Sequence, residues 1–132
     1  MMTLRNDLKI LIADDDKINQ RLATITLAQL GLKCDIASNG EEAVEKHMTH
    51  NYDFIFMDMH MPVLGGIDAT KKIRAYEKDF ESKNQVYIVA LTASELSEKK
   101  EECFEAGMNE FLEKPLQKKI LQGIINHSFK LV

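Results

Sequence analysis

Short apolar segments alternate with longer amphipathic segments along almost the whole chain. The apolar segments have the length and β-branched content of strands, and they lie at residues 10–13, 33–37, 54–57, 86–91 and 110–113. The amphipathic segments have helical spacing, and they lie at about residues 17–30, at 41–50, in a stretch from Gly66 that ends near 76, at 97–106 and at 116–129. The charged stretch 77–84 is typical of a surface loop.

Strands that alternate with helices indicate an α/β domain whose parallel sheet is covered on both faces. The first, third and fourth strands are apolar throughout, which predicts central positions, while the second and fifth mix polar and apolar residues, as edge strands do. The pattern therefore predicts a flavodoxin-like (βα)5 three-layer sandwich with strand order 2-1-3-4-5. A chain of 132 residues is expected to form a single domain, here with its core over about residues 8–127.

Composition narrows the class of protein. The chain has 17 basic and 21 acidic residues, a formal charge of −4, which disfavours direct binding to nucleic acid. No apolar stretch approaches the roughly 18 residues of a membrane span, and the N-terminus lacks the apolar core of a signal peptide. We therefore expect a cytoplasmic domain that makes no membrane contact itself.

Some residues invite a metal-site interpretation that a simpler role explains better. Asp16 precedes a predicted helix, so we expect it to cap that helix or to place a charge in its first turn. His47 and His50 lie three positions apart on a predicted helix, and we expect a solvated face rather than a metal site. Met57 and Met59 are expected to pack in the core.

Polar side chains with useful chemistry end four of the five predicted strands. In open α/β sheets, ligands bind outside the carboxyl ends of the strands where the strand order reverses, which here is between the first and third strands. The residues at these ends are Asp14, Asp15 and Asp16 after the first strand, Asp58 after the third, Thr92 after the fourth and Lys114 after the fifth.

This cluster needs a counter-charge. Carboxylates about 4 Å apart repel one another by about 4 kcal/mol at an effective dielectric constant near 20. An all-oxygen ligand set suits Mg²⁺, with Mn²⁺ as the alternative ion. Bound Mg²⁺ and Lys114 would neutralise a transferring phosphoryl group, and the Thr92 hydroxyl could donate to one of its oxygens. Asp58 is then the natural nucleophile, because aspartyl phosphate is an established covalent intermediate.

Four segments together resemble the signatures of the receiver domains of two-component signalling. Each lies at the end of a predicted strand, and the resemblance covers about residues 8–127. The segments are Ile10–Asp16, Met57–Pro62 with Gly65 and Gly66, Leu91–Ala93, and Lys114–Pro115.

The resemblance implies a phosphorylation site with a metal ion. Asp58 resembles the phosphoacceptor, which takes a phosphoryl group from a partner's phosphohistidine. Asp14 and Asp15 match the acidic pair that holds Mg²⁺ together with Asp58, and the backbone carbonyl of His60 would complete the protein ligands. The His60 side chain lies at a position that can tune hydrolysis of the phosphoryl group.

The resemblance also implies a conformational switch. Thr92 matches the hydroxyl residue that turns toward the phosphoryl group, and Lys114 matches the lysine that pairs with that group. Phe111 occupies the position of the aromatic switch residue. The Lys114–Pro115 bond is expected to be cis.

The residues of two segments, Met57–Pro62 and Asp14–Gln20, resemble those of receivers attached to hybrid sensor histidine kinases. The alternative is a free-standing single-domain response regulator. The implied partner is a histidine kinase or a histidine phosphotransfer domain, and the domain itself would catalyse only its own phosphorylation and dephosphorylation. Ile18, Leu22 and Ile25 lie at helical spacing; most of this stripe is expected in the core, and its edge could dock a partner.

Two rival functions remain. A flavodoxin-like binder of FMN would need a phosphate-binding loop after the first strand, where this chain has three aspartates. A phosphatase of the haloacid-dehalogenase type would usually have a second acid two residues after the nucleophile, where this chain has His60.

Overall fold

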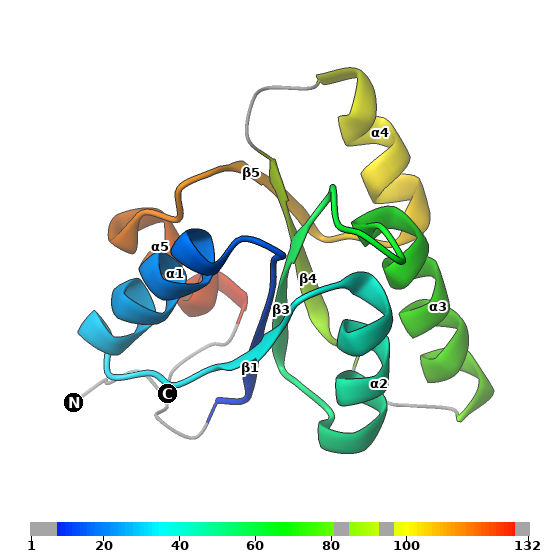
Figure 1. The fold of residues 1–132 in the computed structure, drawn as a ribbon, viewed down its shortest axis with the longest axis horizontal. Helices are drawn as coiled ribbons and strands as arrows, with labels where there is room; N and C mark the ends of the chain where they lie inside the picture. The colour runs from blue at the N-terminus through cyan, green and yellow to red at the C-terminus, as the bar shows by residue number, and fades with distance from the viewer. Residues whose placement is uncertain (1–7, 81–84, 93–96, 129–132) are drawn as a thin grey trace.

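The computed structural model describes residues 8–80, 85–92 and 97–128 (Figure 1). The strands are β1 (Ile10–Ala13), β2 (Asp35–Ala37), β3 (Phe54–Asp58), β4 (Tyr87–Thr92) and β5 (Glu110–Glu113). The helices are α1 (Lys17–Gln29), α2 (Gly40–His50), α3 (Gly66–Asp79), α4 (Ser97–Ala106) and α5 (Lys118–Ser128). Within these residues, no helix has both the length and the hydropathy needed to cross a membrane.

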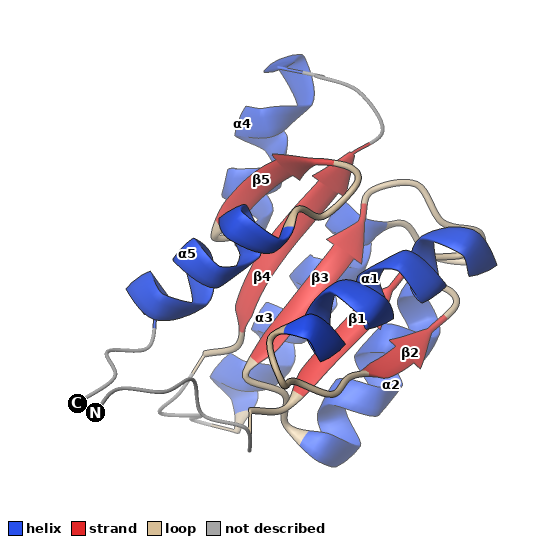
Figure 2. Ribbon diagram, turned by 90° about the vertical axis from the view of Figure 1, so that its left-hand side faces the viewer, coloured by secondary structure: helices blue, strands red, loops and turns tan. Residues whose placement is uncertain are grey.

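The five strands form one parallel sheet in the order β2-β1-β3-β4-β5, which confirms the predicted order and the flavodoxin-like fold. Figure 2 shows that α1 and α5 cover one face of the sheet, while α2, α3 and α4 cover the other. The strands that mix polar and apolar residues, β2 and β5, are the edges. The last predicted helix extends to Phe129, which lies outside the described residues.

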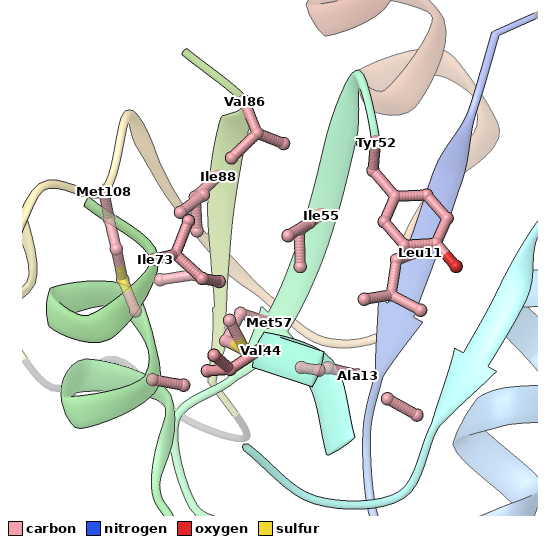
Figure 3. Packing of buried hydrophobic residues seen from close by; sticks show 14 of the residues in the cluster. Leu11, Ala13, Val44, Tyr52, Ile55, Met57, Ile73, Val86, Ile88 and Met108 are labelled. Carbon is pink, nitrogen blue, oxygen red and sulfur yellow. The ribbon is translucent and has the colours of Figure 1, made fainter. Parts of the chain in front are cut away.

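Alternating side chains along the strands build one core on each face of the sheet. Leu11 and Met57 point to the face covered by α2 and α3, where they join Ile73 in a buried cluster (Figure 3). Ile12 and Phe56, one position earlier or later along the same strands, join the cluster under α1 and α5. The two buried faces hold the central strands, and therefore their carboxyl ends, in fixed positions.

A glycine allows α3 to begin directly against the end of β3. A Cβ atom on Gly66 would lie 2.3 Å from the Asp58 carbonyl oxygen, too close for any side chain. The Gly66 N–H donates to the Met59 carbonyl at 3.1 Å, and the Met59 N–H donates to the Leu91 carbonyl at 3.1 Å. Met57 and Met59 are both buried, as predicted. The backbone that follows β3 is thus held by α3 on one side and by β4 on the other.

Two expectations from the sequence are wrong on this side of the molecule. The helix α3 continues to Asp79, so residues 77–79 are helical rather than part of a surface loop, and Glu77 is only 3% exposed. His47 is buried rather than solvated, whereas His50 is exposed as expected. The burial of both side chains has one cause, because Glu77 and His47 are partners of each other.

Glu77 is the centre of a buried network that joins α2, α3 and the start of β4. Its carboxylate accepts hydrogen bonds from Arg74 Nη1 at 2.7 Å and from the Val86 N–H at 2.8 Å, and it lies 3.5 Å from His47 Nε2. His47 Nδ1 accepts from the Tyr52 N–H at 3.1 Å, which leaves Nε2 to carry the proton that faces Glu77. Burial acts to raise the pKa of Glu77, but these hydrogen bonds outweigh it, and the pKa lies below its usual value.

Replacing Glu77 with Gln should lower the free energy of unfolding at pH 7 by about 1–3 kcal/mol, because buried donors lose a charged acceptor. Since the folded pKa is lowered, the wild-type carboxylate stabilises the fold above the unfolded pKa of about 4.3, and this contribution disappears as the pH falls through the folded pKa. In urea titrations the difference between the two proteins should therefore shrink below about pH 4.3. Glu45→Gln, at an exposed position of α2, is the control; an equal loss in both variants at pH 7 would contradict the role of the network.

Candidate functional site

Three aspartates meet at the carboxyl edge of the sheet. Asp14 and Asp15 follow β1, and Asp58 is the last residue of β3. The two strands pair in parallel, with Ala13 opposite Met57, so the residues that come next lie side by side. One carboxylate oxygen from each of the three aspartates lies within 4.8 Å of the others. The structure thus brings together the three carboxylates that the sequence predicts for the metal site.

The three carboxylates differ in their access to solvent. Asp14 and Asp58 are 1% and 5% exposed, whereas Asp15 is exposed. The Asp14 N–H donates to the Ala37 carbonyl at 3.0 Å, and Asp14 Oδ1 accepts from the Asp16 N–H at 2.9 Å. Asp14 is therefore fixed in the crevice, and Asp15 forms its open side.

Asp16 caps α1, as predicted, rather than joining the carboxylate cluster. Its Oδ1 accepts hydrogen bonds from the N–H groups of Ile18 at 2.7 Å and Asn19 at 3.3 Å. The cap sets where α1 begins, directly beside the acidic cluster.

Lys114 provides the cation of the site. Its Nζ lies 3.2 Å from Asp14 Oδ2 and 3.3 Å from Asp58 Oδ2, so one ammonium bridges the ends of β1 and β3. Its position is fixed by the Lys114 N–H, which donates to the Thr92 carbonyl at 2.7 Å, and the following bond to Pro115 is cis as predicted. Burial acts to lower the pKa of Lys114, but the two carboxylates raise it above its usual value, so this ammonium remains charged.

Asp58 lies in conflicting surroundings. Burial raises its pKa, Lys114 lowers it and the neighbouring Asp14 raises it again, and the net pKa is above the usual value. The Asp58 Oδ1 atom also accepts from the His60 N–H at 3.3 Å. Lys114 and the His60 N–H therefore orient the carboxylate, but they do not fully neutralise its charge. A further positive charge at this place would stabilise the ionised form of Asp58.

The predicted switch residues lie on the β4 and β5 side of the crevice. Thr92 ends β4 and is 1% exposed, and Phe111 of β5 lies opposite Ala90 of β4. Phe111 is half-buried and packs against the core cluster under α2 and α3. Ala93, the last residue of the third signature segment, lies outside the described residues.

The donor set fits a small divalent cation. Two oxygen ligands of one octahedral Mg²⁺ ion, each about 2.1 Å away, lie about 3.0 Å apart when adjacent and about 4.2 Å apart when opposite. Carboxylate oxygens that lie within 4.8 Å of one another therefore need to approach by up to about 2 Å to share the ion. Three carboxylates and the single Lys114 ammonium leave two negative charges if all are ionised. A divalent cation would balance this excess charge.

One residue at the site has no role assigned to it by the sequence analysis. Gln20 of α1 donates from Nε2 to the backbone carbonyl of Asp14 at 2.6 Å. It is the last residue of the segment Asp14–Gln20 that resembles hybrid-kinase receivers, and its position one helical turn after the cap Asp16 places it above the end of β1.

Comparisons with known protein families and with individual proteins point to the same family. Residues 10–126 match the family described as response regulator receiver domain. The hybrid signal transduction histidine kinase K of Dictyostelium discoideum is 41% identical over 120 residues, which cover 89% of this chain and 10% of that protein. The chain thus spans about a tenth of the length of this relative.

Solved structures agree with this match. The receiver domain of sensor histidine kinase PA1611 from Pseudomonas aeruginosa PAO1, which holds a magnesium ion in its active site cleft, is 37% identical with a TM-score of 0.78 and covers 91% of this chain and 95% of that chain. The receiver domain of Ssk1 from Saccharomyces cerevisiae, crystallised with the histidine phosphotransfer protein Ypd1, is 34% identical with a TM-score of 0.85 and covers 96% of this chain and 89% of that chain. The chain therefore belongs to the response regulator receiver domains, which act in phosphorelays.

Proposed function

We propose that Asp58 of this receiver domain accepts a phosphoryl group from a phosphohistidine while Mg²⁺ is held by Asp14, Asp15, Asp58 and the His60 carbonyl. The observation that carries this proposal is the convergence of three carboxylates and one lysine at the edge of the sheet. Mn²⁺, which also prefers oxygen ligands, is the alternative ion. The magnesium ion in the PA1611 receiver supports the choice of Mg²⁺.

The residues of the chain would divide the work of the transfer. A carboxylate oxygen of Asp58 attacks phosphorus, the P–O bond forms, the P–N bond to the histidine breaks, and the released imidazole takes up a proton. The bound cation supplies positive charge that stabilises the phosphoryl oxygens. Lys114, already 3.3 Å from Asp58 Oδ2, supplies a second positive charge, and Thr92 supplies a hydroxyl donor.

With acetyl phosphate and Mg²⁺, we expect wild-type protein to incorporate up to one phosphoryl group per chain, because Asp58 is the single nucleophile. Asp58→Asn should reduce labelling at least about 100-fold, since an amide is a poor nucleophile. The measurement is intact-mass spectrometry with and without EDTA, and Asp53→Asn, outside the cluster, is the control. Equal labelling of wild type and Asp58→Asn would refute the assignment, while steady release of phosphate from small esters would favour the phosphatase alternative.

We propose that the phosphoryl group shifts Thr92 and Phe111 together. Phosphorylation adds negative charge and acceptor oxygens at the end of β3, next to the end of β4 that carries Thr92. Movement of Thr92 would vacate space for Phe111. Because Phe111 is only half-buried in this structure, its side chain can move further into the domain when that space opens. The surface formed by α4, β5 and α5 would change as a result.

Phe111→Ala should leave labelling of Asp58 within about two-fold of wild type but remove the structural response, because the bulky side chain that changes position is missing. The response is measured as amide chemical-shift changes over α4, β5 and α5 on addition of beryllofluoride and Mg²⁺. Leu112→Ala, the neighbour that points to the opposite core, is the control. Shifts of wild-type size in Phe111→Ala would remove Phe111 from the switch.

The outer face of α1 is the proposed docking surface for a histidine phosphotransfer or histidine kinase domain. Ile18, Leu22 and Ile25 are 71%, 47% and 48% exposed, so the expectation that most of this stripe lies in the core is wrong; the buried residues of α1 are Ala23 and Leu27. The helix begins beside the carboxylates, because its cap is Asp16. The complex of the similar Ssk1 receiver with Ypd1 supports such a partner.

Ile18→Asp should weaken phosphotransfer from a histidine phosphotransfer protein at least about ten-fold, because apolar anchors dominate the binding energy of interfaces. Labelling by acetyl phosphate should remain near wild type, since the small donor needs no docking surface. The rate of transfer from a phosphorylated partner is the measurement, and Phe104→Asp, at another exposed apolar position on α4, is the control. Equal loss with both donors would place the defect at the site rather than at α1.

We propose that the domain belongs to a hybrid sensor histidine kinase and lies on the cytoplasmic side of the membrane. The support is the identity with the hybrid kinase of Dictyostelium discoideum, of which a receiver is one part. In that case the kinase reaction belongs to another segment of the polypeptide, and this domain acts only on its own Asp58. A free-standing response regulator is the alternative, and the genomic neighbourhood decides between them.

A further inference from the structure

The Gln20 side chain reaches back from α1 to the end of β1. Its Nε2 donates to the Asp14 carbonyl at 2.6 Å and lies 3.4 Å from Ser38 Oγ in the loop between β2 and α2. The orientation of the amide follows from the chemistry, since only the nitrogen can donate to a carbonyl oxygen. One half-buried side chain therefore joins the ends of two neighbouring strands.

Together with two further hydrogen bonds, this hydrogen bond holds the backbone on both sides of Asp15. On the far side of Asp15, the Asp16 N–H donates to Asp14 Oδ1 at 2.9 Å, and the Asp16 carbonyl accepts from the Gln20 N–H at 2.9 Å. The Asp15 side chain itself is exposed and forms no hydrogen bond or ion pair within residues 8–80, 85–92 and 97–128. The backbone on either side of Asp15 consequently sets the direction of its Cα–Cβ bond, from which the carboxylate extends.

We propose that Gln20 is a positioning residue that orients Asp15 toward the metal. The Asp14 carbonyl and the Asp15 nitrogen belong to one planar peptide unit, so holding the carbonyl fixes the plane from which Asp15 starts. The exposed carboxylate is then aimed at the crevice before the ion arrives. This inference rests on the proposed magnesium function.

Gln20 is the side-chain hydrogen-bond partner of the Asp14 backbone carbonyl. Asp14 is 1% exposed, and its N–H, both carboxylate oxygens and carbonyl are each engaged by a different element: β2, the turn at Asp16, Lys114 and α1. Removing the amide of Gln20 releases only the carbonyl, while the Asp14 side chain keeps its partners. The substitution therefore acts on the peptide that leads to Asp15 and leaves the carboxylates themselves in place.

The test compares Gln20→Met, which keeps the length of the side chain and removes the donor, with Gln29→Met at an exposed position of the same helix. Binding of Mg²⁺ to the unphosphorylated chain is measured by isothermal titration calorimetry, and the thermal midpoint is measured in EDTA. We expect Gln20→Met to weaken Mg²⁺ binding about ten-fold, the lower end of the effect of residues that orient metal ligands. Gln29→Met should bind as wild type, and all three midpoints in EDTA should agree within about 2 °C.

Acetyl phosphate labelling supplies a second readout. A residue that positions only a metal ligand should give a labelling rate that returns to the wild-type value at saturating Mg²⁺. Gln20→Ala, which favours the helix more strongly, should repeat the result and serves if Gln20→Met folds poorly.

The failures are distinguishable. Unchanged Mg²⁺ affinity in Gln20→Met, when wild type binds the ion, overturns the role of Gln20 alone. A thermal midpoint of Gln20→Met in EDTA that lies more than about 2 °C below wild type also overturns it, because the residue would then support the fold. A labelling rate that stays low at saturating Mg²⁺ overturns it as well, because the residue would then act on the nucleophile. Absence of Mg²⁺ binding in wild type overturns the proposed function itself.

Discussion

Repulsion among the carboxylates at the end of β1 and β3 is the constraint around which this edge of the domain is organised. The fold brings Asp14, Asp15 and Asp58 within 4.8 Å, yet it supplies one ammonium, Lys114, within contact distance of two of them. Burial adds to the cost, and it raises the pKa of Asp58 despite the nearby cation. A divalent cation would stabilise a site in this condition, because it would relieve a repulsion that the folded chain cannot relieve alone.

A second buried carboxylate, Glu77 at the opposite edge of the sheet, is neutralised by groups of the chain itself. There, Glu77 receives hydrogen bonds from Arg74 and the Val86 backbone and faces His47, and its pKa falls. The network is complete within the chain and joins elements rigidly. The two clusters therefore differ in kind: the Glu77 carboxylate is paired by neighbouring groups, whereas the three carboxylates at the carboxyl edge keep an excess of negative charge.

The sequence predicts the carboxyl edge well because its information is local. Apolar runs identify the central strands, and the residue after each run must lie at the same edge, so the positions of Asp14, Asp58, Thr92 and Lys114 follow from the order of residues alone. The amino edge is predicted poorly, since Glu77 and His47 are 30 positions apart and each looks like an ordinary surface residue of a helix. A buried polar pair becomes visible only when packing brings the partners together. The role of Gln20 is hidden for the same reason, as its partner is a backbone carbonyl that no residue type reveals.

The carboxylate site and the proposed docking surface on α1 occupy separate parts of this molecule, and the separation follows from burial. The carboxylates and Lys114 lie in a crevice whose geometry is held by two cores, so substitutions there disturb charge balance and packing at once. The exposed residues of α1, with Ile18 at 71% exposure, contact little of the core and can change without altering that balance. The helix is nevertheless tied to the site through the cap at Asp16 and the amide of Gln20. A partner that binds α1 therefore meets a surface whose position relative to Asp58 is fixed, which is what transfer between two proteins requires.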